Sequence, residues 1–370
     1  MTAYQIPRKP ARDDRAETPA PDLRLGLRPL ALIGLGLLAV VVFLFSLSLG
    51  SVNITLHDTL TVLLGGEPER ASATRIIHNV RIPQAITAAF AGAALGVSGL
   101  LMQTFFRNPL AGPFVLGISS GASLGVALVI LGTGAFSVPV IVGLGVRGDL
   151  VVAFASSVGA GLTMMAVLFV AGRVGNSLTL LILGVMFGYL TGAVVSLLLY
   201  FSVPQQVDAY VSWSFGTFGR VTTAQLHILI PAVVVGLGLA ALLTKSLNAL
   251  LLGEGYARSM GLNVRLVRWT VIAATGILAG VVTAFCGPVS FIGMAVPHLC
   301  RSLLNTSDHR MLLPACVLMG AAVAMLAGLI ARVPGSHIIL PLNAVTALIG
   351  APVVVWVILK QNNLNRTFAR

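Results

Sequence analysis

Long hydrophobic runs recur along almost the whole chain and are separated by short polar segments. Most of these runs are about 20 residues long, which is the length that an α-helix needs to cross the hydrocarbon core of a bilayer. They lie at about 30–49, 83–105, 114–133, 149–172, 178–203, 224–244, 268–286, 289–300, 312–332 and 340–360. The run at 289–300 is shorter and is broken by Pro297. The pattern predicts ten membrane-spanning segments.

These segments are predicted to be helices. Backbone groups in lipid must form their hydrogen bonds within the protein, so only helices and closed β-barrels span membranes. The strands of a barrel alternate hydrophobic and polar positions over about ten residues, whereas the runs here are longer and continuous. We therefore expect an all-α integral membrane protein.

The same pattern predicts the domain organisation. Residues 1–28 mix charged residues and prolines without periodicity, and we expect them to form a flexible cytoplasmic tail. Residues 29–362 are predicted to form one ten-span domain, and 363–370 a cytoplasmic carboxyl-terminal tail. Between the first two runs, the stretch HDTLTVLLGGE is too short to span a bilayer and predicts a surface helix. No room remains for a separate soluble domain.

The composition agrees with a membrane protein. The chain is 57% hydrophobic and 9% charged, with a mean hydropathy of +0.97, a balance that a soluble core of this size does not need. The cysteines at 286, 300 and 316 have neither paired nor metal-ligand spacing, and we interpret them as small core residues. The sequence predicts no metal site and no cofactor.

The basic residues are distributed unevenly between the two predicted sides of the membrane. With the amino terminus inside, the inner segments hold 17 of the 23 Lys and Arg residues and the outer segments hold 6. The positive-inside rule therefore places both termini in the cytoplasm. Because this bias accounts for the net charge of +12, a nucleic-acid partner is excluded.

The predicted spans carry little chemistry. No nucleophile with a base, no paired carboxylates and no His/Cys ligand cluster occur in them, which argues against an enzyme. Lys9, Lys245 and Lys360 are the only lysines, and none follows the glycines of a phosphate-binding loop. Within a span, His298 is the one ionisable candidate for ion coupling, and beside Pro297 it is interpreted as a helix-packing or backbone-bonding group. An ion-coupled or facilitative secondary transporter is disfavoured but stays open, and a channel lacks a charged ring or filter sequence.

The stretch LLLGEGYARSMGLNV, residues 250–264, interrupts the hydrophobic pattern on the cytoplasmic side. Glu254 and Arg258 are four residues apart and can pair on one face of a helix. Gly253 and Gly261 bracket these residues, and glycine is common at helix ends. The pattern predicts a docking helix of about two turns at about 250–262 on the membrane surface, with a solvated connector as the alternative.

Four stretches resemble one known family. They are RIPQAITAAFAGAALGVSGLLMQTFFRNPLAGPFVLGISSGASLG (81–125), LLLGEGYARSMGLNV (250–264), GPVSFIGMAVPHLCRSLLNTSDHRMLLP (287–314) and LPLNAVTALIGAPVVVWVILK (340–360). In this order they are similar to the FecCD, cobalamin-permease-like, membrane subunits of type II ATP-binding-cassette (ABC) importers, over about residues 30–360.

The resemblance implies an assembly in the bacterial inner membrane. Two identical ten-span permeases pair above two cytoplasmic ABC ATPases, and a periplasmic or lipid-anchored binding protein delivers the ligand. The importer carries a metal chelate, with ferric siderophore as the leading expectation and haem or cobalamin as rivals. ATP hydrolysis is expected of the separate ATPase and not of the permease.

The resemblance also implies roles for particular residues. ATPase coupling is expected of Gly253, Glu254, Ala257, Arg258 and Gly261. Docking of the acidic surface of the binding protein is expected of Arg81 and Arg332, for which a plain interfacial anchor is the alternative. The translocation pathway or gate is expected near Asn176, Ser177, Asn343 and Thr346. The turn FRNPLAGP is interpreted as structural, with ATPase contact as the alternative, and GISSGASLG as a helix-packing segment rather than a ligand contact.

The chain departs from the family pattern at several positions. Gln84 replaces a second arginine, and Gly112 and Ile339 replace acids, so the docking surface need not match the cobalamin system contact for contact. Asn343 replaces a glycine, a variation associated with iron-chelate permeases. His337 lies nearby and is interpreted as a surface-loop histidine rather than a haem-iron ligand.

Overall fold

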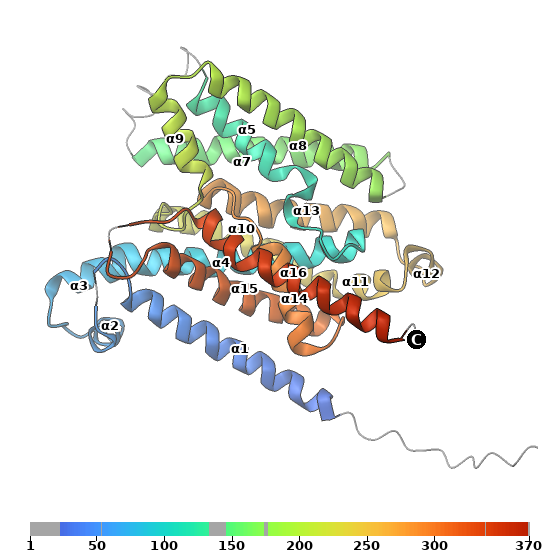
Figure 1. Ribbon diagram of the computed structural model, residues 1–370, viewed down its shortest axis with the longest axis horizontal. Coiled ribbons are helices and arrows are strands. Elements are labelled where there is room, and N and C mark those ends of the chain that lie inside the picture. Colours follow the sequence, from blue (N-terminus) through green and yellow to red (C-terminus); the bar gives the residue numbers. More distant parts are fainter. Residues whose placement is uncertain (1–22, 53, 133–145, 174–176, 337, 369–370) are drawn as a thin grey trace, which may run out of the picture.

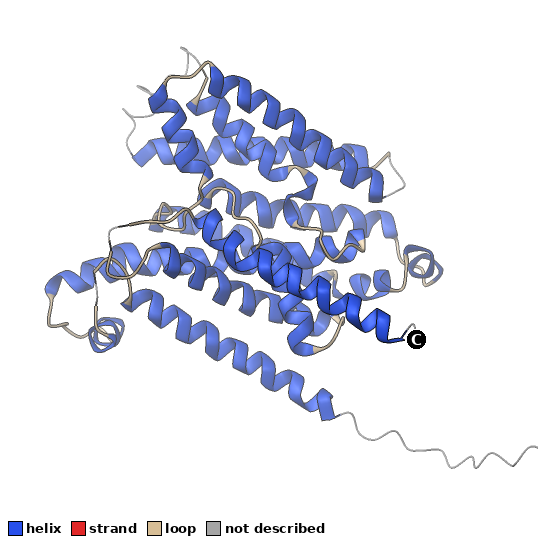
Figure 2. Ribbon diagram, in the orientation of Figure 1, coloured by secondary structure: helices blue, strands red, loops and turns tan. Residues whose placement is uncertain are grey.

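The computed structural model describes residues 23–52, 54–132, 146–173, 177–336 and 338–368. In this part of the chain the secondary structure is helical, without a β-strand (Figure 2), which confirms the predicted all-α class. The α-helices are α1 (Leu23–Ser48), α2 (Leu56–Leu63), α3 (Ala71–Ile76), α4 (Ile82–Phe106), α5 (Ile118–Ile130), α7 (Val146–Ala171), α8 (Ser177–Tyr200), α9 (Pro204–Ser214), α10 (Thr223–Leu242), α11 (Thr244–Leu251), α12 (Glu254–Ser259), α13 (Val264–Cys286), α14 (Ile292–Leu304), α15 (His309–Ala331) and α16 (Leu342–Phe368). A π-helical turn, η1 (Ile77–Arg81), precedes α4, and a 3₁₀ turn, η2 (Pro113–Leu116), precedes α5.

Seven segments of the described chain are long and apolar enough to cross a membrane. They are Pro29–Ser48, Ser72–Phe106, Leu150–Ala171, Thr179–Tyr200, Thr223–Leu242, Val264–Cys286 and His309–Ala331. Three shorter apolar helices are Ile118–Ile130, Ile292–Leu304 and Leu342–Trp356. Each of the ten predicted runs therefore contains a helix, but in three of them the apolar stretch counted among the described residues is shorter than about 20 residues. The count of ten spans stays a prediction.

Two of the short helices begin later than the hydrophobic pattern predicts. Gly117 has a left-handed backbone, with φ of +74°, and separates η2 from α5. Phe291 has φ of +65° and directly precedes α14. Both residues lie inside hydrophobic runs, so hydropathy alone assigns them to spans. A pattern of hydrophobic side chains does not show where the backbone changes conformation, so it does not predict these two turns.

Helix α4 lies in the centre of the bundle and is mostly buried. It packs against α15, α14, α13 and α10. A Cβ atom added at Gly92 would lie 2.1 Å from the carbonyl oxygen of Gly320 in α15. Because such a distance is far below van der Waals contact, only glycine lets these two backbones meet, as is common between membrane helices.

The predicted packing role of GISSGASLG is confirmed. This segment forms the start of α5, which packs against α7. A Cβ atom added at Gly121 would lie 2.7 Å from the carbonyl oxygen of Gly159 in α7. The small residues therefore serve close helix contact.

Elements that the charge distribution assigns to the same side of the membrane lie at the same end of the molecule. The start of α1, helix α12 and the end of α16 lie together on the right in Figure 1, and α2 and α3 lie on the left. The predicted surface helix is confirmed as α2, where the Thr55 side chain accepts a hydrogen bond from the backbone N–H of Asp58 at 3.0 Å. We call the right-hand end the inner end and the left-hand end the outer end.

Candidate functional site

Helix α12 at the inner end is the predicted docking helix. Gly253 precedes it with φ of +120°, and Gly261 follows its last turn with φ of +82°. The two glycines therefore bracket the helix as predicted. The predicted bounds of 250–262 are wrong, because Leu250 belongs to α11 and the turn at Gly253 separates the two helices. A continuous apolar face across 250–260 hid this break.

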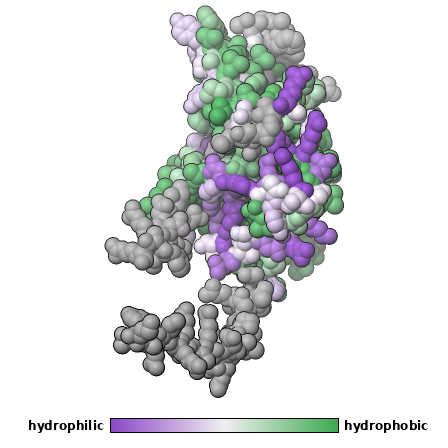
Figure 3. Space-filling model, turned by 90° about the vertical axis from the view of Figure 1, so that its right-hand side faces the viewer, coloured by the Kyte–Doolittle hydropathy of each residue, from purple (hydrophilic) through white to green (hydrophobic). Residues whose placement is uncertain are grey.

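The side chains of α12 divide between an inward and an outward face. Ala257 is fully buried, whereas Tyr256, Arg258 and Met260 are exposed. Figure 3 views this end of the molecule, and hydrophilic side chains gather across the middle of the face below the hydrophobic surface of the upper helices. The outward face of α12 is thus exposed in the single chain.

Glu254 connects α12 to a membrane helix. Its carboxylate lies 3.6 Å from Arg258, the predicted i,i+4 pair, and 3.6 Å from Arg268 in α13. The Arg268 side chain is 8% exposed and its guanidinium lies over the ring of Phe105 in α4, 6.0 Å from the centroid. Arg268 belongs to no local motif, and its one signal in the sequence is a basic residue at the start of a hydrophobic run.

Arg107 forms a second connection to this region. It ends α4 in a left-handed conformation, with φ of +48°, and its Nη2 donates to the carbonyl oxygen of Leu250 at 3.1 Å. A Cβ atom added at Gly253 would lie 3.0 Å from the same nitrogen. The end of α4 therefore contacts the turn between α11 and α12.

The segment after Arg107 has the structural role that FRNPLAGP predicts. The Asn108 side chain accepts from the backbone N–H of Leu110 at 2.9 Å, which closes the turn. Nε2 of His298 lies 2.7 Å from the carbonyl oxygen of Pro109 and donates to it, since a carbonyl only accepts. The backbone-bonding interpretation of His298 is confirmed.

A buried polar network joins α11, α15 and α4 at the same end. The Oδ1 atom of Asn248 accepts from the backbone N–H of His309 at 2.9 Å and from its Nδ1 at 2.7 Å. Nε2 of His309 then lies 2.8 Å from the hydroxyl of Thr104. The Asn248 amide donates to Asp308 at 2.6 Å. The sequence does not predict this network, because its members are far apart along the chain.

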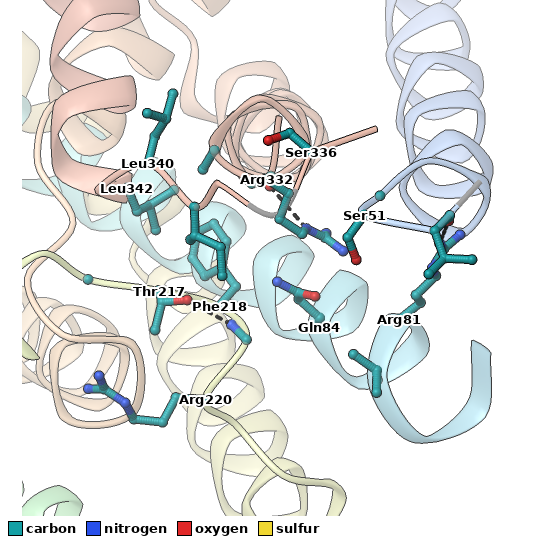
Figure 4. A pocket seen from close by; sticks show the side chains of 18 of the residues that line it. Ser51, Arg81, Gln84, Thr217, Phe218, Arg220, Arg332, Ser336, Leu340 and Leu342 are labelled. Atoms are coloured by element: carbon teal, nitrogen blue, oxygen red, sulfur yellow. Dashed lines mark hydrogen bonds between the residues drawn. The ribbon is translucent and has the colours of Figure 1, made fainter. Parts of the chain in front are cut away.

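A cavity of about 720 Å³ opens at the outer end. It lies between the loop after α1, the start of α4, the loop after α9 and the end of α15. Three arginines line it, Arg81, Arg220 and Arg332, and no acidic residue is among the described residues that line it. We call this space the outer cavity (Figure 4).

Arg81 is 3% exposed, so its side chain does not project from the outer surface, and its docking role stays a prediction. Its guanidinium donates to the carbonyl oxygens of Leu47 at 2.5 Å and Ser48 at 2.6 Å, and also to that of Val52. These carbonyls lie at and beyond the end of α1, where helical partners are missing. The contacts support the alternative role of an anchor for α1.

Arg332 is half-buried and points toward Ser51 across the outer cavity (Figure 4). Its Nε donates to the carbonyl oxygen of Gly328 at 3.2 Å. Burial and the neighbouring charge of Arg81 lower the pKa of Arg332 to about 10, so it is a cation at neutral pH. Arg220, which the sequence analysis did not single out, lies on the opposite side of the cavity beyond Thr217.

The departures from the family pattern lie in two places. Gln84 and Ile339 line the outer cavity. Gly112 lies at the turn before η2, away from this cavity. Only the first two therefore change the chemistry of the outer surface.

The predicted gate residues near α16 are held within the protein. Asn343 accepts from the backbone N–H of Ser290 at 2.9 Å and donates to the carbonyl oxygen of Ser214 at 3.0 Å. Thr346 is 3% exposed, and its hydroxyl donates to the carbonyl oxygen of Asn343 at 3.2 Å. Asn343 thus connects α16 to the end of α9 and to the loop before α14.

Some predicted residues cannot be placed in the same way. Asn176 and His337 lie outside the described residues. Ser177 is the first residue of α8. Among the described residues no group of three His, Cys, Asp or Glu side chains could hold a metal ion.

Comparison with known proteins agrees with this arrangement. The model of the FecCD transport family matches residues 37–360. The vitamin B12 import system permease protein BtuC of Klebsiella pneumoniae is 37% identical over 329 residues, which cover 89% of this chain and 93% of that protein. BtuC of Salmonella typhi is 34% identical over 330 residues, covering 89% and 94%.

A solved structure is also similar to this chain in fold. It is described as an inward-facing conformation of a metal-chelate type ABC transporter, and it matches with a TM-score of 0.77 and 29% identity. The match covers 90% of this chain and 99% of that one. Sequence, fold and hydrophobic spans therefore agree: this chain is a multi-pass inner-membrane permease that belongs to the FecCD transport family.

Proposed function

We propose that this permease is the membrane subunit of an ABC importer that carries a metal chelate into the cytoplasm. The observation that carries the proposal is α12, a short helix with an exposed outer face and ionic and backbone connections to α13 and α4. A partner that moves α12 would act on two central membrane helices. Relatives named as vitamin B12 permeases and a structure named as a metal-chelate transporter support the cargo class.

The assembly that we propose contains a second copy of the chain and two cytoplasmic ATPases. Large apolar side chains of α8 and α16 are exposed in the single chain, among them Met186, Leu190, Leu348 and Trp356. Such faces are suited to lipid or to another copy. Ten spans, with both termini in the cytoplasm, complete the proposed architecture.

At the outer end, we assign docking of the binding protein to the outer cavity. Arg332 and Arg220 supply positive charge at its wall without a lining acid among the described residues. An acidic surface on the binding protein would be attracted there, with most of the effect on orientation and association rate. Arg81 contributes indirectly, because it fixes the end of α1 beside the cavity.

Transport then proceeds by alternating access. ATP binding closes the two ATPases, the closure moves α12, and the connections through Glu254 and Arg107 carry that movement to α13 and α4. Asn343 and Thr346 belong to the proposed gate as residues that hold α16 in place, and Asn176 and Ser177 to its inner end. Discrete rearrangement of packed elements is the usual basis of such switching.

The test is the double substitution Glu254→Ala and Arg258→Ala. We expect normal membrane insertion, because both residues lie in α12, outside the candidate spans. ATP-dependent uptake in proteoliposomes should be lost. Unchanged uptake would refute the coupling assignment, and a purified chain that recruits no ATPase yet transports without ATP would indicate a secondary transporter.

The particular chelate is assigned by a separate measurement. Asn343 supports a ferric siderophore, and the names of the relatives support cobalamin. Because the Asn343 amide is occupied by two backbone groups, it selects neither by direct contact. Thermal-shift binding of the cognate binding protein with siderophores, haem and cobalamin separates these candidates.

A further inference from the structure

A second basic cavity lies at the inner end, beside α12. It has a volume of about 260 Å³ and is lined by Ala171, Gly172, Arg173, Arg258, Val264, Arg265 and Arg268. Four of the seven lining residues are arginines. They come from the end of α7, from α12 and from the start of α13. We call this space the inner arginine pocket.

The charges around the inner arginine pocket are unbalanced. Glu254 is the acid that pairs there, with its carboxylate 3.6 Å from both Arg258 and Arg268. No acidic residue is among the described residues that line the pocket. Helix α13 also begins at Val264 in the wall, and the first turn of a helix favours an anion. The pocket is therefore suited to an anionic group, and arginine matches phosphate oxygens well.

The position of the pocket indicates where the anion comes from. The segments Leu150–Ala171 and Val264–Cys286 are candidate membrane spans, so the pocket lies at the level where α7 ends and α13 begins. The Arg173 guanidinium lies over the ring of Phe169, 4.0 Å from its centroid, and that ring is 59% exposed. Leu266 in the first turn of α13 is 63% exposed. Cations thus adjoin apolar side chains that face outward from the spans.

We propose that the inner arginine pocket binds the phosphate of an anionic phospholipid from the inner leaflet. The head group would contact Arg173 and Arg265, and the acyl chains would lie against Phe169 and Leu266. Basic pockets between membrane helices on the cytoplasmic side are suited to such head groups. Because Arg258 belongs to α12, the bound lipid would connect the docking helix to the ends of α7 and α13. The choice of the inner leaflet rests on the proposed topology, and the proposal does not depend on the identity of the cargo.

The experiment measures lipid retained by the purified full-length chain. Native mass spectrometry compares phosphatidylglycerol with phosphatidylcholine of the same acyl chains, for the wild type and for Arg173→Gln with Arg265→Gln. Both side chains are exposed, so we expect the variant to fold. Lys245→Gln with Arg310→Gln is the matched control, since it removes the same charge from the same end outside the pocket.

We expect the wild type and the control to retain phosphatidylglycerol, and the pocket variant to bind it roughly 30-fold more weakly, from two arginines at an anionic surface. Arg173→Lys with Arg265→Lys should retain part of the binding. Equal binding by the pocket variant and the control would overturn the proposal.

Two further arms separate other sources of the anion. Inorganic phosphate that binds alone and displaces the lipid at equal concentration would show a soluble ligand instead of a lipid. A pocket variant that keeps the lipid but no longer co-purifies with an ATPase would show that the arginines contact an acidic partner. Either result would overturn the lipid assignment.

Discussion

Gly253→Ala should uncouple the permease from ATP without unfolding it. The native backbone at Gly253 has φ of +120° and ψ of +149°, a region that is essentially restricted to glycine. An alanine there would cost about 1–3 kcal/mol in backbone strain. Its Cβ would also lie 3.0 Å from Nη2 of Arg107, which donates to Leu250. A hydrogen bond from a charged group contributes about 1.5–3 kcal/mol, so the contact of α4 with this turn would weaken too.

Energies of about 1–3 kcal/mol are large for the conformation of a single turn but small for the stability of the whole domain. Strain of about 2 kcal/mol shifts the local equilibrium roughly 30-fold away from the native position of α12. The central helices keep their packing, because Gly253 lies outside the candidate spans. The assay is ATP-dependent uptake in proteoliposomes, together with co-purification of the ATPase and the melting temperature of the permease.

Gly255→Ala is the matched control. It lies two residues away inside α12, where an added Cβ has no heavy atom within 4 Å. Alanine is favoured over glycine in a helix by about 0.5–1 kcal/mol, so this variant should couple normally. If Gly253→Ala transports as well as Gly255→Ala, the strained turn is not required for coupling.

Three other predictions concern the rest of the molecule. Asn343→Gly removes both side-chain hydrogen bonds that connect α16 to its neighbours. We expect the free energy of unfolding to fall by about 1–3 kcal/mol, which a lower melting temperature would show. An unchanged melting temperature would refute the connecting role of Asn343. Asn248→Ala leaves Nδ1 of the buried His309 without its partner, so thermal stability should fall by about 1–3 kcal/mol, whereas the exposed Lys245→Ala should be neutral. Arg332→Gln should slow association of the binding protein several-fold at low salt, with a smaller effect at high salt. Because a guanidinium stays protonated throughout this range, the Arg332 contribution should be constant from about pH 6 to 9. A steep change near pH 7, measured as binding of the binding protein to the immobilised permease, would contradict it.

The hydrophobic pattern predicted where the helices lie but not where the backbone turns within them. Each predicted run contains a helix, because an apolar run of this length has few alternatives in lipid. The late starts of α5 and α14 depend on positive φ angles at Gly117 and Phe291. The conformation at Phe291 had no signal in the sequence, since a bulky residue rarely adopts it.

The candidate site was predictable where its residues are close along the chain. The bracketing glycines and the pair of Glu254 with Arg258 follow from spacing alone. The contacts of Glu254 with Arg268 and of Arg107 with Leu250 depend on how separate helices pack. Arg81 was expected to face outward, yet its position beside the unpaired carbonyls of α1 determines its contacts. Contacts between residues that are far apart in the sequence cannot be predicted from a local motif.

Helix α1 is synthesised long before the helix against which it mainly packs. It packs mainly against α15, which begins about 260 residues after α1 ends. At about 5–20 residues per second, roughly 13 to 52 seconds pass between the two. During that interval α1 must remain in the bilayer without its main partner. It is the most hydrophobic of the seven candidate spans, whereas the central α4 lies in the least hydrophobic. Lipid can therefore hold α1 through biogenesis, while α4 depends on helices that are made after it.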